Sequence, residues 1–498
     1  MSNESKETTS MSHGSWRADG SLMHTNSTGA PGWGNPKGSI VACADSNRPA
    51  KESSWALELK APVQVQVELT EGCNQNCLHC YNYWRPLSTY KPETKYLSVE
   101  DIRRIVGELR SNEVISVTVT GGEPFVRTRE LFALLEEAQV AGIATSINTN
   151  LSLPTTDDID RLASEYPNIS LLVSLLSSDP DLHERLTTTR KGTYAKVIRN
   201  VNRAVSRGLR VNVNMVVMHE NLKEIRKVAE LALDLGAKTF CATKVVPPVH
   251  ARAADFFLSH DEVLWFLSEL INIENDLGIH VDSLQTYPMC MLVGTEAFSR
   301  FSDHACAAGI STLTIGADGA ARPCSQVPVA YGNILREGLP SIWRRMCGWR
   351  EGEFLPEKCR DCKILGSCTA GCRMNSILAG LKGMDYYAEP EKILTADREH
   401  LLARGRRERN LNNLPDRVGV SHGLKIRAEA FGAVVYLLEP WGLILINKPA
   451  SAFLTAMDNK PFTFKEFVKA SGVSNDGDDA DVSRLFYRLF EKQMLVPM

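Results

Sequence analysis

The sequence predicts an α/β fold built around a parallel sheet. Strand-like and helical segments alternate between residues 60 and 250, and six such units fit into this stretch. Strands that alternate with helices of this length form βαβ units, whose strands run parallel. Such a sheet is either open or closed into a barrel. At roughly 150 residues per domain, a chain of 498 residues is expected to hold about three domains.

The first strand is predicted by a period of two. Apolar residues stand at every second position and alternate with polar ones: Val63, Val65, Val67 and Leu69. Five more strands are expected at 115–120, 143–148, 171–176, 211–217 and 239–242. Helical periodicity is expected at 99–111, 130–141, 194–207 and 221–235, with a helical spacer at 259–277.

The C-terminal segment has a pattern of its own. Strands are predicted at 433–438 and 443–447, and helices at 450–457, 463–471 and 481–493. This order is typical of a small winged-helix domain. Residues 1–55 are rich in Ser, Gly, Asn and Thr, so they are expected to form a disordered tail.

Composition excludes several classes of protein. Lys and Arg total 56 against 59 Asp and Glu, so no global basic excess points to nucleic acid or to an anionic membrane. The longest apolar stretch near the C-terminus is broken by Glu439 and Pro440 and is shorter than the roughly 18 residues of a membrane span. The N-terminus shows no targeting signal. A cytoplasmic protein without a membrane or nucleic-acid partner is expected.

Nine of the thirteen cysteines fall into two groups. The first, Cys73, Cys77 and Cys80, forms C-x3-C-x2-C directly after the first predicted strand, where α/β sheets place ligand sites. Three thiolates can hold three irons of a four-iron cube and leave the fourth iron open to a substrate. A zinc site is the alternative, but zinc prefers four closed ligands, and only His79 could be the fourth nearby.

A second motif follows the second strand. Gly121, Gly122, Glu123 and Pro124 form a GGEP turn, which taken alone could be an ordinary turn with an exposed acid. Together, the cysteine motif and this turn resemble the signature of the radical SAM superfamily. The resemblance implies a partial (β/α)6 barrel, and a turn whose backbone and Glu hold the amino group of S-adenosylmethionine.

The resemblance also implies a chemistry. S-adenosyl-L-methionine chelates the open iron of a [4Fe–4S] cluster, and one electron cleaves it to give a 5′-deoxyadenosyl radical that abstracts hydrogen from substrate. Family position suggests that polar residues on successive strands face the cofactor: Asn148, Asn150, Ser174 and Asn214. They could equally be hydrogen-bonding residues at strand ends. Arg185 and Arg190 are alternative partners for the SAM carboxylate. No catalytic residue is assigned.

The second group has the spacing of an auxiliary-cluster domain. Cys306 is followed by Gly319-x4-Cys324 and then by C-x2-C-x5-C-x3-C, which comprises Cys359, Cys362, Cys368 and Cys372. This pattern resembles the SPASM extension of radical SAM enzymes that modify peptides and proteins. The resemblance implies one or two auxiliary iron-sulfur clusters, with one at Cys306, Cys324 and Cys372 and the other at the three remaining cysteines.

One ligand of that pattern is missing. The family supplies a further cysteine after an Asp-Pro pair, but here the matching stretch contains Glu389 and Pro390, and no cysteine follows Cys372. The second cluster is therefore expected to have a non-cysteine ligand or an open iron, or to be absent. Cys347 and Cys290 are the nearest spare thiols; each is expected to be a buried apolar residue, and a role as a ligand is the alternative. A structural zinc domain is the alternative.

Two further observations bear on the substrate. Sulfatase-maturing relatives carry an acidic base at the position of Ser325, so sulfatase maturation is not expected. Residues 421–498 contain nine Lys or Arg and nine Asp or Glu, which gives no basic face for DNA. Residues 424–436 resemble the peptide-chaperone domain of pyrroloquinoline quinone biosynthesis, or RiPP recognition element. That family binds leader peptides as an added strand. A purely structural cap is the alternative.

The expected organisation is a tail (1–55), a radical SAM core (56–258), a SPASM-like domain (259–392), a charged linker (393–420) and a peptide-binding winged helix (421–498). The resemblances imply a maturase that modifies, and as we expect crosslinks, a ribosomally made precursor peptide, with a reductant such as ferredoxin or flavodoxin. One alternative is a radical SAM enzyme acting on a small molecule such as a tetrapyrrole. Another is a zinc-stabilised DNA-binding regulator.

Overall fold

The computed structural model describes the chain with gaps. The described residues are 15–16, 22–23, 58–82, 84, 95–248, 255–292, 297–298, 301, 304–362, 364–378, 385–389, 391, 415–438, 442–458, 460–471 and 479–498. Most of the expected tail and most of the expected linker lie outside them. Within residues 1–55 only a short antiparallel pair, β1 (Ser15–Trp16) and β2 (Leu22–Met23), is described.

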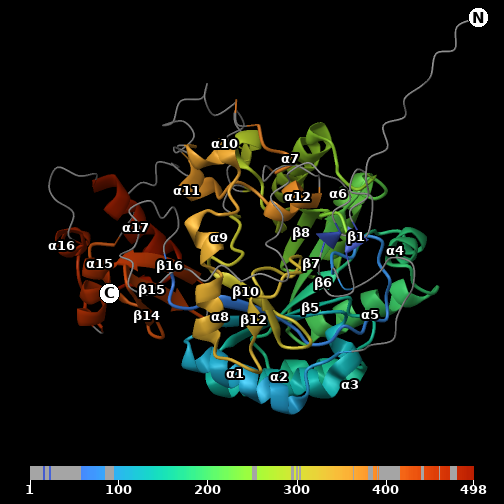
Figure 1. Cartoon of the computed structure of the whole chain (residues 1–498), viewed down its shortest axis with the longest axis horizontal. Coiled ribbons are helices and arrows are strands. Elements are labelled where there is room, and N and C mark those ends of the chain that lie inside the picture. Colours follow the sequence, from blue (N-terminus) through green and yellow to red (C-terminus); the bar gives the residue numbers. More distant parts are fainter. Residues whose placement is uncertain are drawn as a thin grey trace, which may run out of the picture.

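A ten-stranded sheet organises the main body (Figure 1). Its order is β12-β11-β10-β3-β4-β5-β6-β7-β8-β9, and every pair from β10 through β3 to β9 is parallel. The parallel strands are β3 (Gln64–Glu68), β4 (Ser116–Thr120), β5 (Ala144–Thr149), β6 (Ser170–Ser174), β7 (Arg210–Val217), β8 (Thr239–Lys244), β9 (His280–Asp282) and β10 (Thr312–Ile315). Among the described strands β9 and β12 end the sheet without pairing, so the barrel is partial. The predicted α/β class is confirmed.

Helices cover one face of this sheet. They are α1 (Val99–Ser111), η1 (Pro124–Arg127), α2 (Thr128–Ala141), α3 (Thr156–Glu165), α4 (Pro180–Thr187), α5 (Thr193–Ser206), η2 (Leu222–Glu224), α6 (Ile225–Asp234) and α7 (His260–Leu277). Val65 and Val67 of β3 are fully buried toward this layer, where Ile102 and Ile105 of α1 pack. The predicted strands and helices of this region are present, while α3 and α4 were not predicted.

The other face of the sheet is polar. Gln64 Nε2 donates to Thr118 Oγ1 at 3.0 Å, and Thr118 Oγ1 lies 3.0 Å from Ser146 Oγ, so three neighbouring strands are linked across their inner surface. Apolar residues of the same strands alternate with these groups and face the helices. The partial barrel therefore has an apolar outer shell and a hydrogen-bonded interior.

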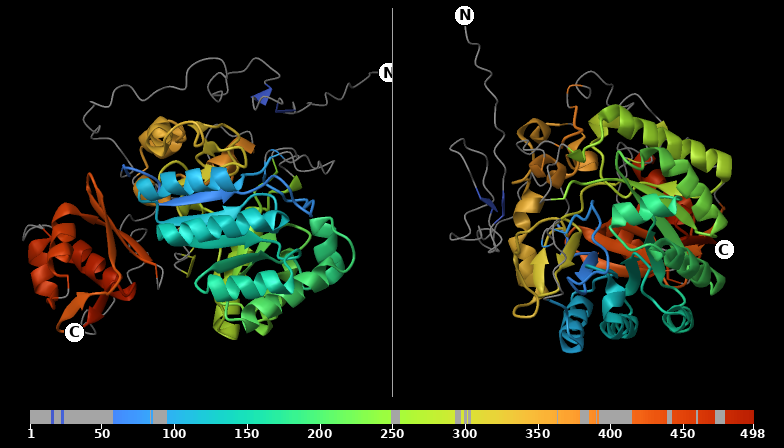
Figure 2. Two further views of the ribbon diagram at one scale, coloured as in Figure 1. Left: turned by 90° about the horizontal axis from the view of Figure 1, so that it is seen from below. Right: turned by 90° about the vertical axis from the view of Figure 1, so that its right-hand side faces the viewer.

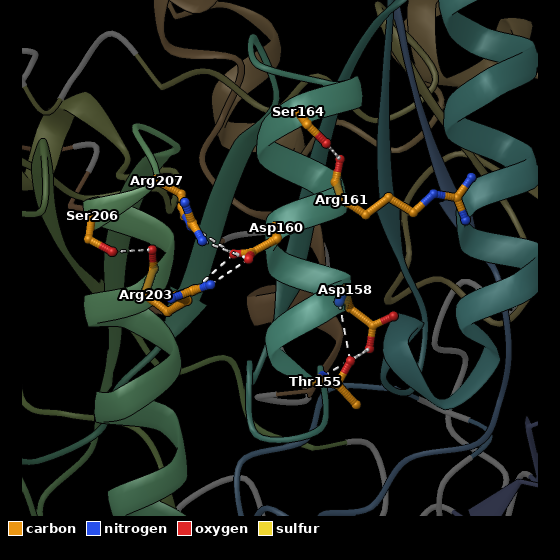
Figure 3. A network of polar contacts seen from close by, with 8 residues as sticks. All are labelled: Thr155, Asp158, Asp160, Arg161, Ser164, Arg203, Ser206 and Arg207. Atoms are coloured by element: carbon orange, nitrogen blue, oxygen red, sulfur yellow. Dashed lines mark hydrogen bonds and ion pairs between the residues drawn. The ribbon is translucent and has the colours of Figure 1, made fainter.

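The outer helices are also joined by ion pairs, which Figure 3 shows for α3 and α5. Arg203 and Arg207 of α5 both contact the carboxylate of Asp160 on α3, with Arg207 Nη2 at 2.8 Å from Asp160 Oδ2. Hydrogen bonding from Arg203 lowers the pKa of Asp160. The contact lies on the outside of the barrel and stabilises the helical layer.

The cysteine-rich segment extends the sheet and adds short helices. Antiparallel strands β11 (Ala320–Arg322) and β12 (Gly332–Asn333) follow β10. The helices are η4 (Met289–Leu292), α8 (Leu339–Arg345), α9 (Cys347–Glu351), α10 (Glu357–Arg360), α11 (Leu365–Cys368) and α12 (Arg373–Leu378). Because β10 pairs with β3 in parallel register, this segment returns to the strand that precedes the first cysteine group.

The C-terminal unit is a separate body beside the barrel (Figure 2). It has two small antiparallel sheets, one with β14 (Lys425–Glu429), β15 (Gly432–Leu437) and β16 (Gly442–Asn447), the other with β13 (Val418–Val420) and β17 (Leu495–Pro497). Its helices are α15 (Lys448–Ala456), α16 (Phe464–Ala470) and α17 (Asp479–Glu491). Its predicted strands and helices are present, and β13, β14 and β17 were not predicted. The winged-helix assignment and the domain boundaries stay predictions.

This unit docks on the barrel at the amino ends of β3 and β4. Val434 packs with Leu59, Val63 and Ile115, while the opposite side of its sheet packs against its own helices. Arg427 is 1% exposed, and its guanidinium donates to the carbonyls of residues 61, 62 and 113. The docking surface is therefore at the opposite end of β3 from the first cysteine group.

Candidate functional site

The first cysteine group lies in the loop that leaves the carboxyl end of β3. Cys73 is buried, and Cys77 and Cys80 are half-buried. The loop is fixed to α4 by backbone hydrogen bonds from Asn76 N to Thr187 O at 3.1 Å and from Leu78 N to Leu186 O at 3.0 Å. The fold thus places the loop that carries these three thiols at the carboxyl edge of the sheet, and their role as cluster ligands stays a prediction.

The GGEP turn holds this loop through backbone contacts that require glycine. Gly122 N donates to Thr70 O at 2.7 Å, and Glu123 N donates to Gly72 O at 2.7 Å. A Cβ on Gly122 would stand 2.0 Å from the Gly72 carbonyl oxygen, and Gly121 has a φ of +125°, which favours glycine. The turn therefore has a specific function in the fold, which is to hold the ends of β3 and β4 together.

Glu123 is buried rather than exposed. It is 1% accessible, and its carboxylate accepts from Thr149 Oγ1 at 2.7 Å, from Asn150 N at 2.7 Å and from Phe125 N at 3.2 Å. Burial raises the pKa of Glu123 to about 7, and these three donors counteract part of that rise. The carboxylate connects the turn after β4 to the end of β5. Its contact with the SAM amino group stays a prediction.

Asn150 connects the end of β5 to the cysteine loop. Its Nδ2 donates to Asn74 Oδ1 at 3.0 Å, and Ser152 donates to its Oδ1. Asn74 Nδ2 in turn donates to Ser152 Oγ at 2.9 Å. Asn150 therefore acts here as a residue that positions the loop, and the sequence did not single out Asn74.

The other three predicted SAM-facing residues share one face of the sheet. Asn148 is in register with Leu172, which lies on the same face of β6 as Ser174, and Ser174 is in register with Asn214. All three are half-buried on the polar inner face, and Asn214 Oδ1 accepts from Thr243 Oγ1 at 2.6 Å. They stay predicted cofactor contacts. Arg185 and Arg190 are exposed and line a surface cleft beside α4.

A buried ion pair and a tyrosine connect the two cysteine groups. Glu68 at the end of β3 contacts Arg322 of β11 at 2.5 Å, and both side chains are almost fully buried. Burial raises the pKa of Tyr81 to about 12, and the nearby charges of Glu68, Cys80 and Cys324 add to that rise. Tyr81 is therefore close to one thiol of each group.

The three cysteines of the first predicted auxiliary set, Cys306, Cys324 and Cys372, pack against the same hydrophobic core. Burial raises the pKa of Cys372 to about 12, with a further contribution from Cys306, which also raises the pKa of Cys324. The backbone is fixed by Cys306 N, which donates to Thr369 Oγ1 at 2.7 Å, and by Cys372 N, which donates to Asp385 Oδ2 at 2.6 Å. Their role as ligands stays a prediction.

A buried lysine lies beside this set. Lys244 at the end of β8 is 1% exposed, and its Nζ has no hydrogen-bond partner among the described residues. Burial lowers its pKa, while nearby Asp385 and Cys372 oppose that shift. Its Nζ also lies 5.1 Å from the Tyr287 ring centroid. A buried amine without a hydrogen-bond acceptor among the described residues fits an anionic group bound at the neighbouring thiols.

The second predicted auxiliary set lines a cavity of its own. Cys359, Cys362 and Cys368 surround it together with Ile364, Leu365 and Ala370. Backbone Met289 N donates to Cys368 Sγ at 3.2 Å. Thiols in an apolar cavity with backbone N–H groups directed at sulfur are the donor set that iron-sulfur clusters use. Cys290 lines the same cavity, which the sequence did not predict.

The first cysteine group has hydrogen-bond donors beside its thiols. In the part of the chain that the structure describes, no three His, Cys, Asp or Glu side chains are arranged to hold one metal ion. In the first group, Gln75 N donates to Cys73 Sγ at 3.4 Å, and the buried Gln75 Nε2 has no partner among the described residues. Unused donors beside several thiols suit a sulfur-rich anionic group. No described helix is long and apolar enough to cross a bilayer.

Comparison with known proteins identifies the two cysteine-bearing regions. Residues 67–232 match the model of the radical SAM superfamily, and residues 306–363 match that of the SPASM iron-sulfur cluster-binding domain. The chain is a radical SAM enzyme with a SPASM domain. Its cofactors are accordingly a [4Fe–4S] cluster, S-adenosylmethionine and auxiliary iron-sulfur clusters.

Two relatives differ in their named activities. The chain is 25% identical over 335 residues to an AdoMet-dependent heme synthase of Methanosarcina barkeri, covering 64% of this chain and 93% of that one. It is also 25% identical over 332 residues to the antilisterial bacteriocin subtilosin biosynthesis protein AlbA of Bacillus subtilis, covering 64% and 69%. Relatives of this radical SAM enzyme therefore act in both peptide and tetrapyrrole biosynthesis.

Solved structures share the fold. Streptococcus suis SuiB bound to S-adenosylmethionine matches with a TM-score of 0.54 at 18% identity, over 66% of this chain and 76% of SuiB. SuiB bound to its precursor peptide SuiA matches with a TM-score of 0.53 at 19% identity, over 66% and 75%. The anSMEcpe enzyme with AdoMet matches with a TM-score of 0.52 at 18% identity, over 68% and 98%.

Proposed function

We propose that this radical SAM enzyme modifies, and in particular crosslinks, a ribosomally made precursor peptide that the C-terminal unit captures. The observation that carries the proposal is the edge strand β16. In the three-stranded sheet β16 pairs with β15, and its other edge has no partner strand among the described residues. An extended peptide can add to such an edge through backbone hydrogen bonds.

The surface of β16 supports this role. Leu445 is 40% exposed, and Leu443, two residues earlier on the same face of the strand, packs at the docking surface with the barrel. A side-chain pocket beside an open edge gives a peptide strand both affinity and register. The likeness to AlbA, which is named for bacteriocin biosynthesis, also favours a peptide substrate.

The chain's own residues have distinct parts in this proposal. When bound, the cofactors supply the electron that cleaves S-adenosylmethionine and the radical that takes a hydrogen atom from the peptide. Cys73, Cys77 and Cys80 would hold the cluster, the GGEP turn would hold the loop and the methionine moiety, and the polar inner face would orient the adenosyl group. The helical layer around the barrel would exclude water from the radical.

The distance between the two ends of the barrel constrains the substrate. Ten residues of the chain separate Val63, at the docking surface, from Cys73, and an extended chain covers at most roughly 35 Å over that length. For a peptide anchored at the C-terminal unit, a linker on the order of ten residues would therefore be long enough to bring its modified part to the iron site. This length suits a leader peptide followed by a core peptide.

The experiment uses the full-length, anaerobically reconstituted enzyme and the peptide encoded by a short reading frame beside its gene. Mass spectrometry after incubation with S-adenosylmethionine and dithionite should find the peptide lighter by two hydrogen atoms, as one crosslink requires. An unmodified peptide, together with turnover of a tetrapyrrole substrate, would refute the proposal. That outcome would support the second candidate function, which the likeness to the heme synthase favours.

The role of β16 can be tested by introducing one negative charge on this strand. Leu445→Asp should weaken binding of that peptide about tenfold, since a carboxylate in place of the exposed apolar side chain costs on the order of 1.4 kcal/mol, while uncoupled cleavage of S-adenosylmethionine stays unchanged. Val140→Asp is the matched control, because Val140 on α2 is 74% exposed and far from this sheet in sequence. Isothermal titration would measure both affinities. Equal weakening in the two variants would contradict strand addition at β16.

A further inference from the structure

The second predicted auxiliary set lacks the last cysteine of the SPASM pattern. Cys359, Cys362 and Cys368 provide three ligands, and no cysteine follows Cys372 in the sequence. A four-iron cluster with three thiolates has one open iron, whereas a fourth thiolate closes it. The question is therefore whether the fold brings another thiol to this cavity.

Cys290 is a fourth thiol that lines this cavity. It belongs to the short helix η4, whose residues Met289–Leu292 are all buried, and it lines the same cavity as the three cysteines. Met289 is in contact with Cys368 and with Ile364, so η4 forms one wall of the cavity. In the sequence, Cys290 precedes the other cysteines of the domain, and it is the fold that brings it to them.

The surroundings of Cys290 match those of Cys368. Backbone Glu389 N donates to Cys290 Sγ at 3.1 Å, just as Met289 N donates to Cys368 Sγ at 3.2 Å. Cys290 and Cys368 are each 8% exposed. Hydrogen bonds from backbone N–H groups stabilise sulfur that carries negative charge, which the sulfur of a neutral buried thiol does not need.

The donor to Cys290 belongs to the part of the chain where the family has its last cysteine. Glu389 begins the stretch that matches the Asp-Pro pair, after which the family supplies that cysteine. Here the backbone N–H of Glu389 donates to Cys290 Sγ. The described start of that stretch therefore lies next to the upstream thiol.

We propose that Cys290 is the fourth thiolate ligand of the auxiliary cluster held by Cys359, Cys362 and Cys368. This cluster is then fully ligated by protein, and it carries electrons without binding substrate. The inference concerns cofactor ligation and does not depend on the identity of the substrate. A single zinc ion on the same four thiols is the competing occupant, and measurement of iron, zinc and sulfide distinguishes it from a cluster.

The test compares two substitutions at Cys290. If Cys290 is a ligand, Asp should be tolerated better than Val; if Cys290 only packs in the core, Val should be tolerated better. Valine suits a buried apolar site but cannot bind iron, whereas aspartate can bind iron but is costly in an apolar core. Cys290→Val and Cys290→Asp would be made in a Cys73→Ala/Cys77→Ala/Cys80→Ala background, so that the remaining iron is auxiliary. The matched control is Cys241→Val, because Cys241 on β8 is 3% exposed and does not line the cavity.

Iron, zinc and acid-labile sulfide would be measured per chain, together with the EPR spectrum after reduction. We expect Cys290→Val to lose about four irons and four sulfides or to retain only a three-iron cluster, Cys241→Val to match the parent, and Cys290→Asp to hold more iron than Cys290→Val. The proposal is overturned if Cys290→Val keeps the iron, sulfide and spectrum of the parent, if Cys290→Asp binds less iron than Cys290→Val, or if the parent holds zinc that Cys290→Val loses.

Discussion

Glu123 shows how one buried group can serve both the site and the fold. Its carboxylate accepts three hydrogen bonds that join the turn after β4 to the end of β5. In the unfolded chain it ionises near its ordinary pKa of 4.5, and in the folded chain near 7. Between these values the folded chain holds one more proton, so its free energy of unfolding falls as pH rises.

Replacement of Glu123 by Gln should remove this pH dependence. Relative to Glu123→Gln, the wild-type protein should lose on the order of 3 kcal/mol of stability between pH 4.5 and pH 7, and no more above that range. Urea unfolding of both proteins across the pH range gives the difference, in which the other titrating groups cancel. Parallel stability curves would show that the carboxylate is ionised throughout.

Gly122 lies where two loops touch through their backbones. A Cβ at this position would stand 2.0 Å from the Gly72 carbonyl oxygen, so Gly122→Ala must displace the cysteine loop. Cleavage of S-adenosylmethionine should fall roughly a hundredfold, since a displacement of about 1 Å at reacting groups costs that much. The release of 5′-deoxyadenosine under dithionite is the measurement.

The matched control for that variant is Gly107→Ala. Gly107 lies in α1 with no heavy atom within 4 Å of an added Cβ, so its replacement leaves the loop in place. Normal activity in both variants would mean that the loop contact through Gly122 is not needed for the chemistry.

At the scale of elements, patterns among neighbouring residues predicted the barrel. Features that depend on contacts between distant residues were missed. The period of two around Val65 and the helical period of α1 depend on one buried face each, and that face is visible in the sequence. Strand β14 was missed because its Arg427 and Glu429 are charged yet buried, so it has no apolar alternation. Helix η4 is four residues long and apolar, so nothing local marks Cys290 as a partner of distant thiols.

The candidate site shows the same difference between local motifs and long-range contacts. Cysteine spacing and the GGEP turn predicted which residues gather at the carboxyl ends of β3 and β4, because both motifs are short. Asn74, which fixes the cysteine loop, and Lys244, which lies near Cys372, could not be predicted, since their functions depend on contacts between segments far apart in the chain. Three-dimensional proximity is what identifies them.

Strand β14 attaches the C-terminal unit through a buried ion pair. Arg427 lies 2.7 Å from Glu429 Oε1, and both side chains are at most 1% exposed. Arg427→Met leaves a buried carboxylate without its partner, so the unit should lose about 3–5 kcal/mol of stability. Arg427→Met/Glu429→Gln removes both charges and should recover the part of that loss that comes from the unpaired carboxylate, while the carbonyls of residues 61, 62 and 113 stay without this donor.

Hydrogen exchange at the amino ends of β3 and β4 would measure this detachment. Exchange at residues 61–63 and 113–116 should rise in Arg427→Met and return toward wild type in the double variant. Cleavage of S-adenosylmethionine should persist in both, because the cysteine loop leaves the opposite end of β3. Equal exchange in all three proteins would mean that apolar packing alone holds the unit.

At the scale of the whole molecule, one strand connects three functions. The amino end of β3 carries the C-terminal unit, its carboxyl end carries the first cysteine group, and its edge pairs with β10 of the SPASM domain. Peptide capture, radical generation and electron transfer would therefore share one rigid element. Under the proposed function, the peptide would exchange at one end of the barrel while the cofactors stay fixed at the other.

The central claim is that the loop with Cys73, Cys77 and Cys80 holds the cluster that cleaves S-adenosylmethionine. The direct measurement is 5′-deoxyadenosine released per chain by the anaerobically reconstituted protein, compared between wild type and Cys77→Ala. Two thiolates cannot hold the cube, so the variant should release none above background while its auxiliary iron remains. Equal release of 5′-deoxyadenosine by the two proteins would contradict the account.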